Sequence, residues 1–203
     1  MSNEQPTYGN GYADKLGCVD TIDGVSIPAD WWSRCYEYPW VLHNIKKGTT
    51  VVDAGCGVEH PLKLFLASRC SRVYAVDTDA RISDFTGPAN VEYRRESICS
   101  IGLPTGSVDA VVCVSVLEHM PVGLRDAAFR EFSRLIKPDG RILITADIPT
   151  VPIDTLRKLS ESYGLRPYGE VNWTVKPSSL LEPVRAGRTA TLRRAFCIVL
   201  IKG

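Results

Sequence analysis

Two short apolar segments, each ending in an acidic residue, constrain this chain more than any other feature. The first is VVD at residues 51–53, which the glycine-rich turn AGCG follows at residues 54–57, and the second is VYAVD at residues 73–77. The distance along the chain between Asp53 and Asp77 fits one strand–helix–strand unit with parallel strands. The carboxyl ends of such strands meet at one edge of a sheet, where nucleosides bind. The sequence therefore predicts a nucleoside pocket on a parallel sheet.

Strand-like and helix-like segments alternate through the middle of the chain. Runs rich in β-branched residues predict buried strands, and segments with helical periodicity separate them. This alternation favours an α/β fold, a doubly wound and mostly parallel sheet of seven strands. The predicted parallel strands are residues 49–54, 72–76, 91–94, 108–116 and 141–146, and the predicted helices are residues 61–68, 79–85, 124–136 and 153–163.

The two ends of the chain depart from this alternation. Residues 1–28 are rich in Gly, Asn, Thr and Pro and predict a loose lead-in. In the aromatic segment that follows, Asp30 is expected to cap a helix that ends before Pro39, and a second helical stretch follows. Residues 166–175 and 195–201 resemble strands with no helix between them, which predicts an antiparallel C-terminal hairpin.

We therefore divide the chain into two parts. Residues 1–45 form an N-terminal arm with a helical segment, and residues 46–203 form the main domain. A turn, KPDG at residues 137–140, is expected to separate the last central helix from the strand after it.

Composition excludes several classes of protein. The 24 Lys and Arg nearly balance the 23 Asp and Glu, so the chain has no overall field for nucleic acid or a membrane surface. The 7 Cys form no CxxC pair and only 3 His are present, which predicts buried free thiols and no metal site. No signal peptide or membrane-spanning run is recognisable, so we expect a cytoplasmic protein without membrane or nucleic-acid partners.

The glycine-rich turn narrows the class of cofactor. Gly55 and Gly57 let the backbone approach a ligand, and Asp77 can accept hydrogen bonds from both hydroxyls of a ribose, with Asp79 as a nearby alternative. A dinucleotide site needs a third glycine, which is absent here, and the charge of Glu59 would repel a pyrophosphate. S-adenosylmethionine is a nucleoside cofactor without phosphate, so this objection does not apply to it.

The ordered motifs resemble those of the class I S-adenosylmethionine-dependent methyltransferases, in particular the group acting on small molecules. The matching motifs are VDAGCG at residues 52–57, YAVD at residues 74–77, LPTGSVDAVVCVSVLEHM at residues 103–120 and FSRLIKPDGR at residues 132–141. One such motif is weak, but their occurrence in order through the chain is specific. The resemblance implies S-adenosylmethionine as cofactor and a Rossmann-like methyltransferase fold.

The resemblance also implies roles for individual residues. Ser115 would lie at the mouth of the site, facing the reactive methyl group, and the aromatic N-terminal segment would form a lid from which Arg34 or Tyr36 reaches the cofactor carboxylate. The other predicted cofactor contacts are Asp53, Gly55 and Gly57 at the methionine and ribose portion, Asp77 at the ribose hydroxyls, and Thr78, Glu96, Ser97 and Ile98 at the adenine.

Methyl transfer to a hydroxyl group needs a general base. His119 is the best candidate by location and ordinary pKa, and a histidine with a purely structural role at a strand–helix junction is the alternative. His60, Tyr36 and Asp147 are weaker candidates for the base.

Three functions remain to be weighed. The first is methyl transfer to a small-molecule, sugar or natural-product acceptor, free or bound to a carrier. The second is a regulatory or structural subunit that binds S-adenosylmethionine without catalysis. RNA methylation is disfavoured by the near-neutral charge. The acceptor atom, the pathway and the oligomeric state stay open.

Overall fold

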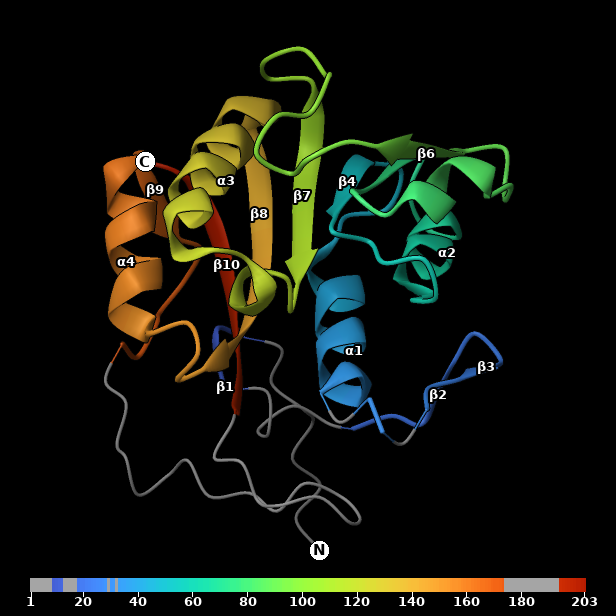
Figure 1. The fold of residues 1–203 in the computed structure, drawn as a ribbon. Coiled ribbons are helices and arrows are strands. Elements are labelled where there is room, and N and C mark those ends of the chain that lie inside the picture. Colours follow the sequence, from blue (N-terminus) through green and yellow to red (C-terminus); the bar gives the residue numbers. More distant parts are fainter. Residues whose placement is uncertain (1–8, 13–17, 29, 32, 174–193) are drawn as a thin grey trace, which may run out of the picture.

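The computed structural model describes residues 9–12, 18–28, 30–31, 33–173 and 194–203. Its centre is a sheet whose strands follow the order β1-β10-β8-β7-β4-β5-β6, with β9 paired to β10 beside this row (Figure 1). This row and the helices between its strands confirm the predicted α/β fold. A separate small hairpin consists of β2 (Thr21–Ile22) and β3 (Val25–Ser26).

The strands from β8 to β6 in this row are parallel, as the sequence predicts. β5 and β7 lie on opposite sides of β4, so the strand order reverses at β4. Such a reversal separates the loops at the carboxyl ends of the strands and leaves room for a ligand. The parallel strands are β4 (Thr50–Ala54), β5 (Arg72–Asp77), β6 (Val91–Arg95), β7 (Val108–Val114) and β8 (Ile136–Ile148).

The antiparallel strands complete one edge of the sheet. β10 (Arg194–Lys202) pairs with β8, and it also pairs with β9 (Leu165–Pro167) and β1 (Gly11–Tyr12). The β9–β10 pair confirms the C-terminal hairpin, although β9 is much shorter than the predicted strand. β1 belongs to the segment predicted as a loose lead-in, yet it adds a strand to the sheet.

Helices cover both faces of the sheet (Figure 1). On one face α3 (Val122–Leu135) packs against β7 and β8, and α4 (Ile153–Ser162) packs against β9 and α3, so that both helices bury large apolar side chains. On the other face α1 (Arg34–Asn44) packs against β8 and β10, and α2 (Leu62–Ala67) packs against β4 and β5, with Trp40 and Phe65 at most 2% exposed. Each such side chain contributes about 1.5–3 kcal/mol by leaving water. The 3-10 helices η2 (Ala80–Asp84) and η3 (Leu117–His119) follow β5 and β7.

The aromatic segment before β4 forms one helix where the sequence predicts two. α1 begins after Ser33, not after Asp30, and continues through Pro39. Proline lacks the N–H that would bond to the carbonyl of Cys35, one turn earlier. The backbone N–H of Val19 donates to that carbonyl at 3.0 Å, so its oxygen stays satisfied. The predicted helix end at Pro39 and the predicted cap at Asp30 are therefore wrong.

β8 begins earlier than the sequence predicts. Residues 137–140 are expected to form a turn, but they lie within the strand. Ile136 pairs with Val108 of β7 and Arg141 pairs with Ala110, so these residues bulge outward between two paired positions. The turn-forming residues are accommodated as an irregularity in a continuous strand.

Some findings concern classes of site. Among the helices of the described residues, none is both long and apolar enough to cross a membrane. The same residues contain no group of His, Cys, Asp and Glu that could hold a metal ion. All seven cysteines are free thiols.

Candidate functional site

Two adjoining hollows lie at the carboxyl ends of β4, β7 and β8. The inner crevice is narrow, about 10 Å³, and the outer cavity has a volume of about 230 Å³. Arg34 and His60 line both, so the two hollows meet at these side chains. The inner crevice is also lined by Tyr38, Asp53, Gly55, Cys56, Leu62 and Val114, and the outer cavity by Asp30, Trp31, Ser33, Ser115, Glu118, His119 and Asp147.

The loop after β4 contains two positions that suit only glycine. Gly55 has a φ of +76° and Gly57 a φ of +58°, in the left-handed region that residues with a side chain disfavour. A Cβ on Gly55 would lie 2.5 Å from Cγ2 of Val116, and a Cβ on Gly57 would lie 2.6 Å from Cδ2 of His60. The absence of both side chains lets the loop, the residues after β7 and His60 come together.

A buried lysine donates hydrogen bonds to the backbone of the same loop. Lys63 of α2 is 2% exposed. Its Nζ donates to the carbonyl oxygens of Gly57 at 2.6 Å, Val58 at 3.1 Å and His60 at 2.5 Å. These three acceptors satisfy the buried ammonium group, so Lys63 fixes the shape of the turn.

Asp53, at the end of β4, carries an unsatisfied oxygen. The residue is 2% exposed, and among the described residues its Oδ2 has no hydrogen-bond partner. Burial raises the pKa of this carboxyl group to about 7; the charge of Asp77 adds to the rise, whereas those of Lys63 and Arg34 oppose it. A buried acceptor without a donor marks a place where a ligand can supply one.

Asp77, at the end of β5, lies directly beside the glycine loop, as predicted. Its Oδ2 accepts the backbone N–H of Gly57 at 2.8 Å, and its Oδ1 accepts the N–H of Asp79 at 3.0 Å. Each carboxylate oxygen keeps a further lone pair for a hydroxyl donor. Thr78, the next residue, is exposed. The structure thus brings Asp77 and Gly57 together at the edge of the sheet.

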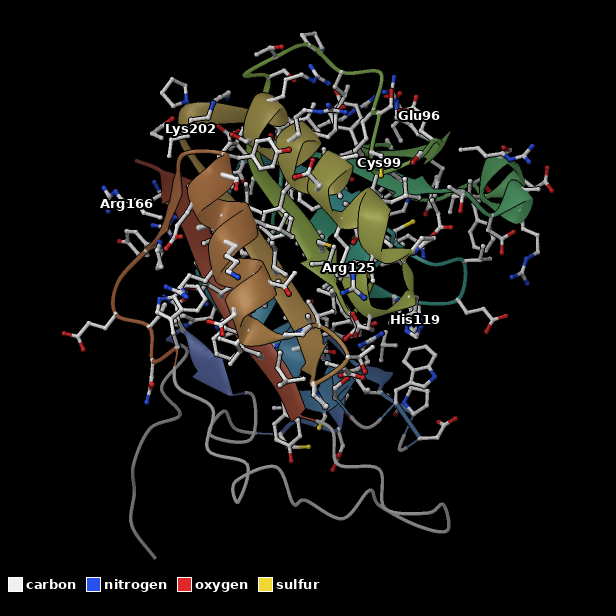
Figure 2. All side chains as sticks on the ribbon, turned by 60° about the vertical axis from the view of Figure 1, so that its left-hand side comes forward. Glu96, Cys99, His119, Arg125, Arg166 and Lys202 are labelled. Atoms are coloured by element: carbon white, nitrogen blue, oxygen red, sulfur yellow. The ribbon has the colours of Figure 1, made fainter. Side chains whose placement is uncertain are left out.

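The residues predicted at the adenine lie in the loop after β6. Oε2 of Glu96 accepts the N–H of Gly102 at 2.9 Å, and the hydroxyl of Ser97 accepts a neighbouring backbone N–H at 3.2 Å. Ile98 is 6% exposed and packs into the core beneath α3. Figure 2 shows Glu96 and His119 at opposite ends of the surface beside α3. The loop is thus well folded, and these residues do not line either hollow.

The outer cavity combines a histidine with carboxyl groups. His119 is exposed, and Glu118 and Asp147 contribute to the wall. Oε1 of Glu118 accepts the N–H of Asp147 at 3.3 Å, and within the described part of the chain Oε2 is buried without a hydrogen-bond partner. Burial, together with the charges of Asp147 and Glu37, raises the pKa of Glu118 to about 7. The cavity therefore offers, in Glu118, a carboxyl group that exchanges its proton near neutral pH.

Glu37 of α1 ties this helix to the ends of two strands. Its Oε1 accepts hydrogen bonds from the hydroxyls of Ser115, at 2.7 Å, and Thr145, at 2.6 Å. Its Oε2 pairs with Nη1 of Arg34. Ser115 follows β7 with a φ of +50°, an uncommon backbone conformation for a residue with a side chain. The carboxylate therefore helps hold an unusual turn at the mouth of the site.

Arg34 and Tyr36, both predicted at the cofactor carboxylate, have different surroundings. Arg34 lines both hollows, whereas Tyr36 packs against the core on the α1 face of the sheet. Tyr38 lines the inner crevice instead, and its hydroxyl lies 3.2 Å from Nδ1 of His60. The ring of His60 also contacts that of Trp31, with centroids 4.4 Å apart and the ring planes tilted by 54°. Aromatic residues of the N-terminal segment thus meet the glycine loop.

Sequence reasoning missed Glu37 and Lys63. The spacing of Arg34 and Glu37 predicts an ion pair along a helix, but such pairs are usually exposed and weak. The signal that could have found Lys63 is a single charge inside the apolar run LKLFLA of α2. In both cases the local pattern does not say which distant groups surround the charge.

Sequence comparison finds methyltransferases. Residues 52–144 match the model of a family described as a methyltransferase domain. The ubiquinone biosynthesis O-methyltransferase of Xanthomonas oryzae pv. oryzae (strain PXO99A) is 33% identical over 164 residues, which cover 71% of this chain and 65% of that protein. The 2-methyl-6-phytyl-1,4-hydroquinone methyltransferase of Synechocystis sp. is 28% identical over 146 residues, covering 69% of this chain and 42% of that protein. The chain thus spans less than two thirds of the length of these relatives.

Solved structures share the fold. A TehB-like SAM-dependent methyltransferase from Corynebacterium glutamicum superposes with a TM-score of 0.60 at 19% identity, over 82% of this chain and 87% of the other. The magnesium protoporphyrin IX methyltransferase of Synechocystis, solved with bound SAM, has a TM-score of 0.58 at 18% identity, over 82% and 76% of the two chains. At these identities the likeness concerns the fold alone.

Proposed function

We propose that this chain, a member of the class I S-adenosylmethionine-dependent methyltransferases, transfers the methyl group of its cofactor to a hydroxyl oxygen of a small-molecule acceptor. The observation that carries the proposal is the outer cavity beside the inner crevice. One hollow contains the glycine loop and Asp53, and the adjoining one contains His119 and Glu118. A cofactor and an acceptor in these places would meet between the two hollows.

The inner crevice suits S-adenosylmethionine in its chemistry. The cofactor supplies a methyl group made electrophilic by the sulfonium. The unsatisfied Oδ2 of Asp53 can accept a hydrogen bond from the ammonium group, and the bare backbone of Gly55 and Gly57 permits close approach. In the proposal Asp77 holds the ribose hydroxyls, and Thr78, Glu96, Ser97 and Ile98 border the adenine.

The N-terminal helical segment is proposed as a lid over the cofactor. The inner crevice has an open volume of about 10 Å³, which is the size of a single water site. Admission of a nucleoside therefore requires the side chains that close the crevice, Tyr38 and His60 among them, to change position. Arg34 is the proposed partner of the cofactor carboxylate, and Tyr38 takes the place of Tyr36 because it lines the crevice. Ser115 borders the methyl group from the outer cavity.

His119 is the proposed general base. Methyl transfer to a phenol needs removal of a proton from a hydroxyl with a pKa of about 10. His119 lies at the edge of the outer cavity, where an acceptor enters, and Glu118 beside it along the chain carries a carboxyl group with a pKa of about 7. A carboxylate at Glu118 would stabilise the imidazolium formed at His119.

A phenolic hydroxyl is the acceptor group we favour. Two of the similar proteins bear names that refer to ubiquinone biosynthesis and to a hydroquinone. The cavity volume of about 230 Å³ suits a single aromatic ring with small substituents, and the indole ring of Trp31 in its wall can stack on such a ring. A larger or carrier-bound acceptor would have to extend out of the cavity.

The test uses calorimetry and product release. We expect S-adenosylmethionine to bind, and S-adenosylhomocysteine to be released with catechols or hydroxybenzoates at a higher kcat/KM than with matched anilines or thiophenols. Binding without release on any acceptor would favour a non-catalytic subunit. Faster release with the amine or thiol series would contradict the hydroxyl acceptor.

A further inference from the structure

Glu37 has the charge and burial of a functional group but touches neither hollow. Its side chain is fully buried, and neither set of lining residues includes it. Its three hydrogen-bonding partners come from α1, from the end of β7 and from β8. A carboxylate placed there affects the site through other side chains.

The Glu37 carboxylate is held in its charged form. Burial alone would raise its pKa, but the charge of Arg34 and the hydrogen bonds from the Thr145 and Ser115 hydroxyls outweigh burial and lower it. A buried carboxylate that stays ionised exerts a strong field on the cation paired with it, because little water screens the pair. That cation is the Arg34 guanidinium.

The pair fixes where the guanidinium lies. Nη1 of Arg34 bonds to Oε2 of Glu37 and, at 3.2 Å, to the hydroxyl of Ser33. The guanidinium also lies over the ring of Tyr38, 6.0 Å from its centroid. An arginine side chain has many rotamers, and these contacts stabilise the one in which it lines both hollows.

We propose that Glu37 is a positioning residue that holds the Arg34 guanidinium ready for the carboxylate of the cofactor, and so sets the affinity for the amino-acid end of S-adenosylmethionine. The inference rests on the proposed function, in which Arg34 binds that carboxylate. Glu37 itself does not contact the cofactor. Glu37 also accepts a hydrogen bond from the Ser115 hydroxyl, so the same carboxylate links Arg34 to the end of β7.

A purely structural role is the competing explanation, because Glu37 also anchors α1 to the sheet. The two roles differ in which part of the ligand they affect. 5′-Methylthioadenosine has the adenine, ribose and sulfur of the cofactor but lacks its carboxylate and ammonium groups. Loss of the helix anchor would weaken both ligands, whereas loss of the Arg34 orientation would weaken only the ligand with a carboxylate.

The experiment measures the dissociation constants of S-adenosylmethionine and 5′-methylthioadenosine by calorimetry, in the full chain. Glu37→Gln keeps the size of the side chain and removes its charge. We expect it to weaken S-adenosylmethionine about tenfold or more, the size expected for a charge-assisted hydrogen bond, and 5′-methylthioadenosine less than about twofold. Arg34→Gln should have the same selective effect, and the double variant should be no worse than Arg34→Gln alone.

The chain offers a matched control. Glu131 and Arg134 of α3 form another ion pair with the same spacing along a helix, and Glu131 is 7% exposed. Oε1 of Glu131 also accepts the backbone N–H of Ile101 at 2.7 Å. Glu131→Gln removes a comparable buried charge away from both hollows, so the ratio of the two dissociation constants should stay at the wild-type value.

Each outcome decides between the explanations. Equal weakening of both ligands by Glu37→Gln, or an unchanged affinity for S-adenosylmethionine, would overturn the inference. Glu37→Asp keeps the charge on a shorter side chain and should give a smaller change in the same ratio, so it carries the test if the Gln variant does not fold. A wild-type protein that binds neither ligand would instead refute the proposed function. Binding of both ligands with no effect of Arg34→Gln would refute the inference and the assignment of Arg34 to the cofactor carboxylate, but not the proposed methyl transfer.

Discussion

Carboxyl groups at the two ends of the parallel sheet differ in how many hydrogen-bond partners the fold provides for them. At the amino end, the Asp109 carboxylate accepts a hydrogen bond from Nζ of Lys137 at 2.6 Å and another from the backbone N–H of Thr50 at 2.8 Å. Burial works against its charge, but these partners outweigh burial and lower its pKa. At the carboxyl end, burial raises the pKa values of Asp53 and Glu118 to about 7, and among the described residues each has an oxygen without a hydrogen-bond partner.

The two ends of the sheet differ in how their carboxyl groups are compensated, and not in whether a cavity is present. A cavity of about 100 Å³ also exists at the amino end, lined by Lys46, Asp109 and Arg141 among others. Its acid is paired within the fold, whereas Asp53 and Glu118 at the carboxyl end each keep one oxygen without a hydrogen-bond partner among the described residues. In the part of the chain that the structure describes, buried carboxyl oxygens without a donor therefore distinguish the carboxyl end of this sheet from the amino end better than a hollow does.

The largest expected effect tests the chemistry at the carboxyl end. His119→Gln should lower kcat about 100-fold or more, the range typical of a lost general base. The dissociation constant of S-adenosylmethionine should hardly change, since the proposed base contacts the acceptor. Stopped assays of S-adenosylhomocysteine release measure the first quantity and calorimetry the second. His43→Gln, in the last turn of α1, is the control and should keep wild-type turnover.

A second test separates backbone strain from loss of the binding surface. Gly55→Ala would put a methyl group 2.5 Å from Val116, and we expect cofactor binding to weaken about 100-fold or more. Gly106 precedes β7 at the amino end with a similar φ of +64°, but a Cβ there meets nothing within 4 Å. Gly106→Ala should lower the melting temperature without changing the dissociation constant. Similar binding losses in both variants would contradict the assigned site.

A third test uses two separate variants, each of which removes one acid from one end of the sheet. Asp77→Ala should weaken S-adenosylmethionine by about 1.5–3 kcal/mol, because charge-assisted hydrogen bonds to the ribose are lost. Asp109→Ala should destabilise the fold by about 1 kcal/mol and leave the affinity unchanged. Calorimetry and urea unfolding of both variants provide the measurements. If Asp77→Ala binds with wild-type affinity, the ribose lies elsewhere.

The smallest expected effect concerns pH. In the folded chain Asp53 keeps its proton up to a pKa of about 7, whereas in the unfolded chain it ionises near pH 4. Between these values the folded state binds more protons, so its stability without cofactor falls as the pH rises. The unfolding free energy of the wild type should fall by about 2 kcal/mol more between pH 5.5 and 8 than that of Asp53→Asn.

Asp109 provides the comparison for this effect. Its pKa is lowered, so it is ionised in both states throughout that interval. Asp109→Asn should therefore keep the wild-type dependence of stability on pH. If the unfolding free energies of the wild type and of Asp53→Asn change equally with pH, Asp53 is ionised in the folded chain.

Local patterns in the sequence were enough to predict most of the architecture. The apolar runs that became β4, β5 and β7 and the helical periodicity of α3 are properties of neighbouring residues, so they can be read without the fold. The order of parallel strands then places Asp77 beside the glycine loop, and the hydrogen bond between Asp77 and Gly57 agrees with that placement.

Contacts between residues far apart in the sequence determined the parts of the fold that the local patterns did not predict. α1 continues through Pro39 because Val19, far away along the chain, satisfies the carbonyl that proline cannot. β8 contains the residues expected to form a turn because its pairing with β7 resumes at Arg141. Propensity favours one local conformation, but a hydrogen bond or a strand partner from elsewhere can stabilise another.

By itself the sequence determined the central parallel strands and which acids stand at their carboxyl ends, because periodicity and chain order are local information. Only the tertiary structure decided which charges are compensated. Glu37 finds its hydroxyl partners 78 and 108 residues away, whereas an oxygen of Asp53 finds none in the described chain. The energy of a buried charge depends on all the dipoles and charges around it, and these assemble only when the chain is folded.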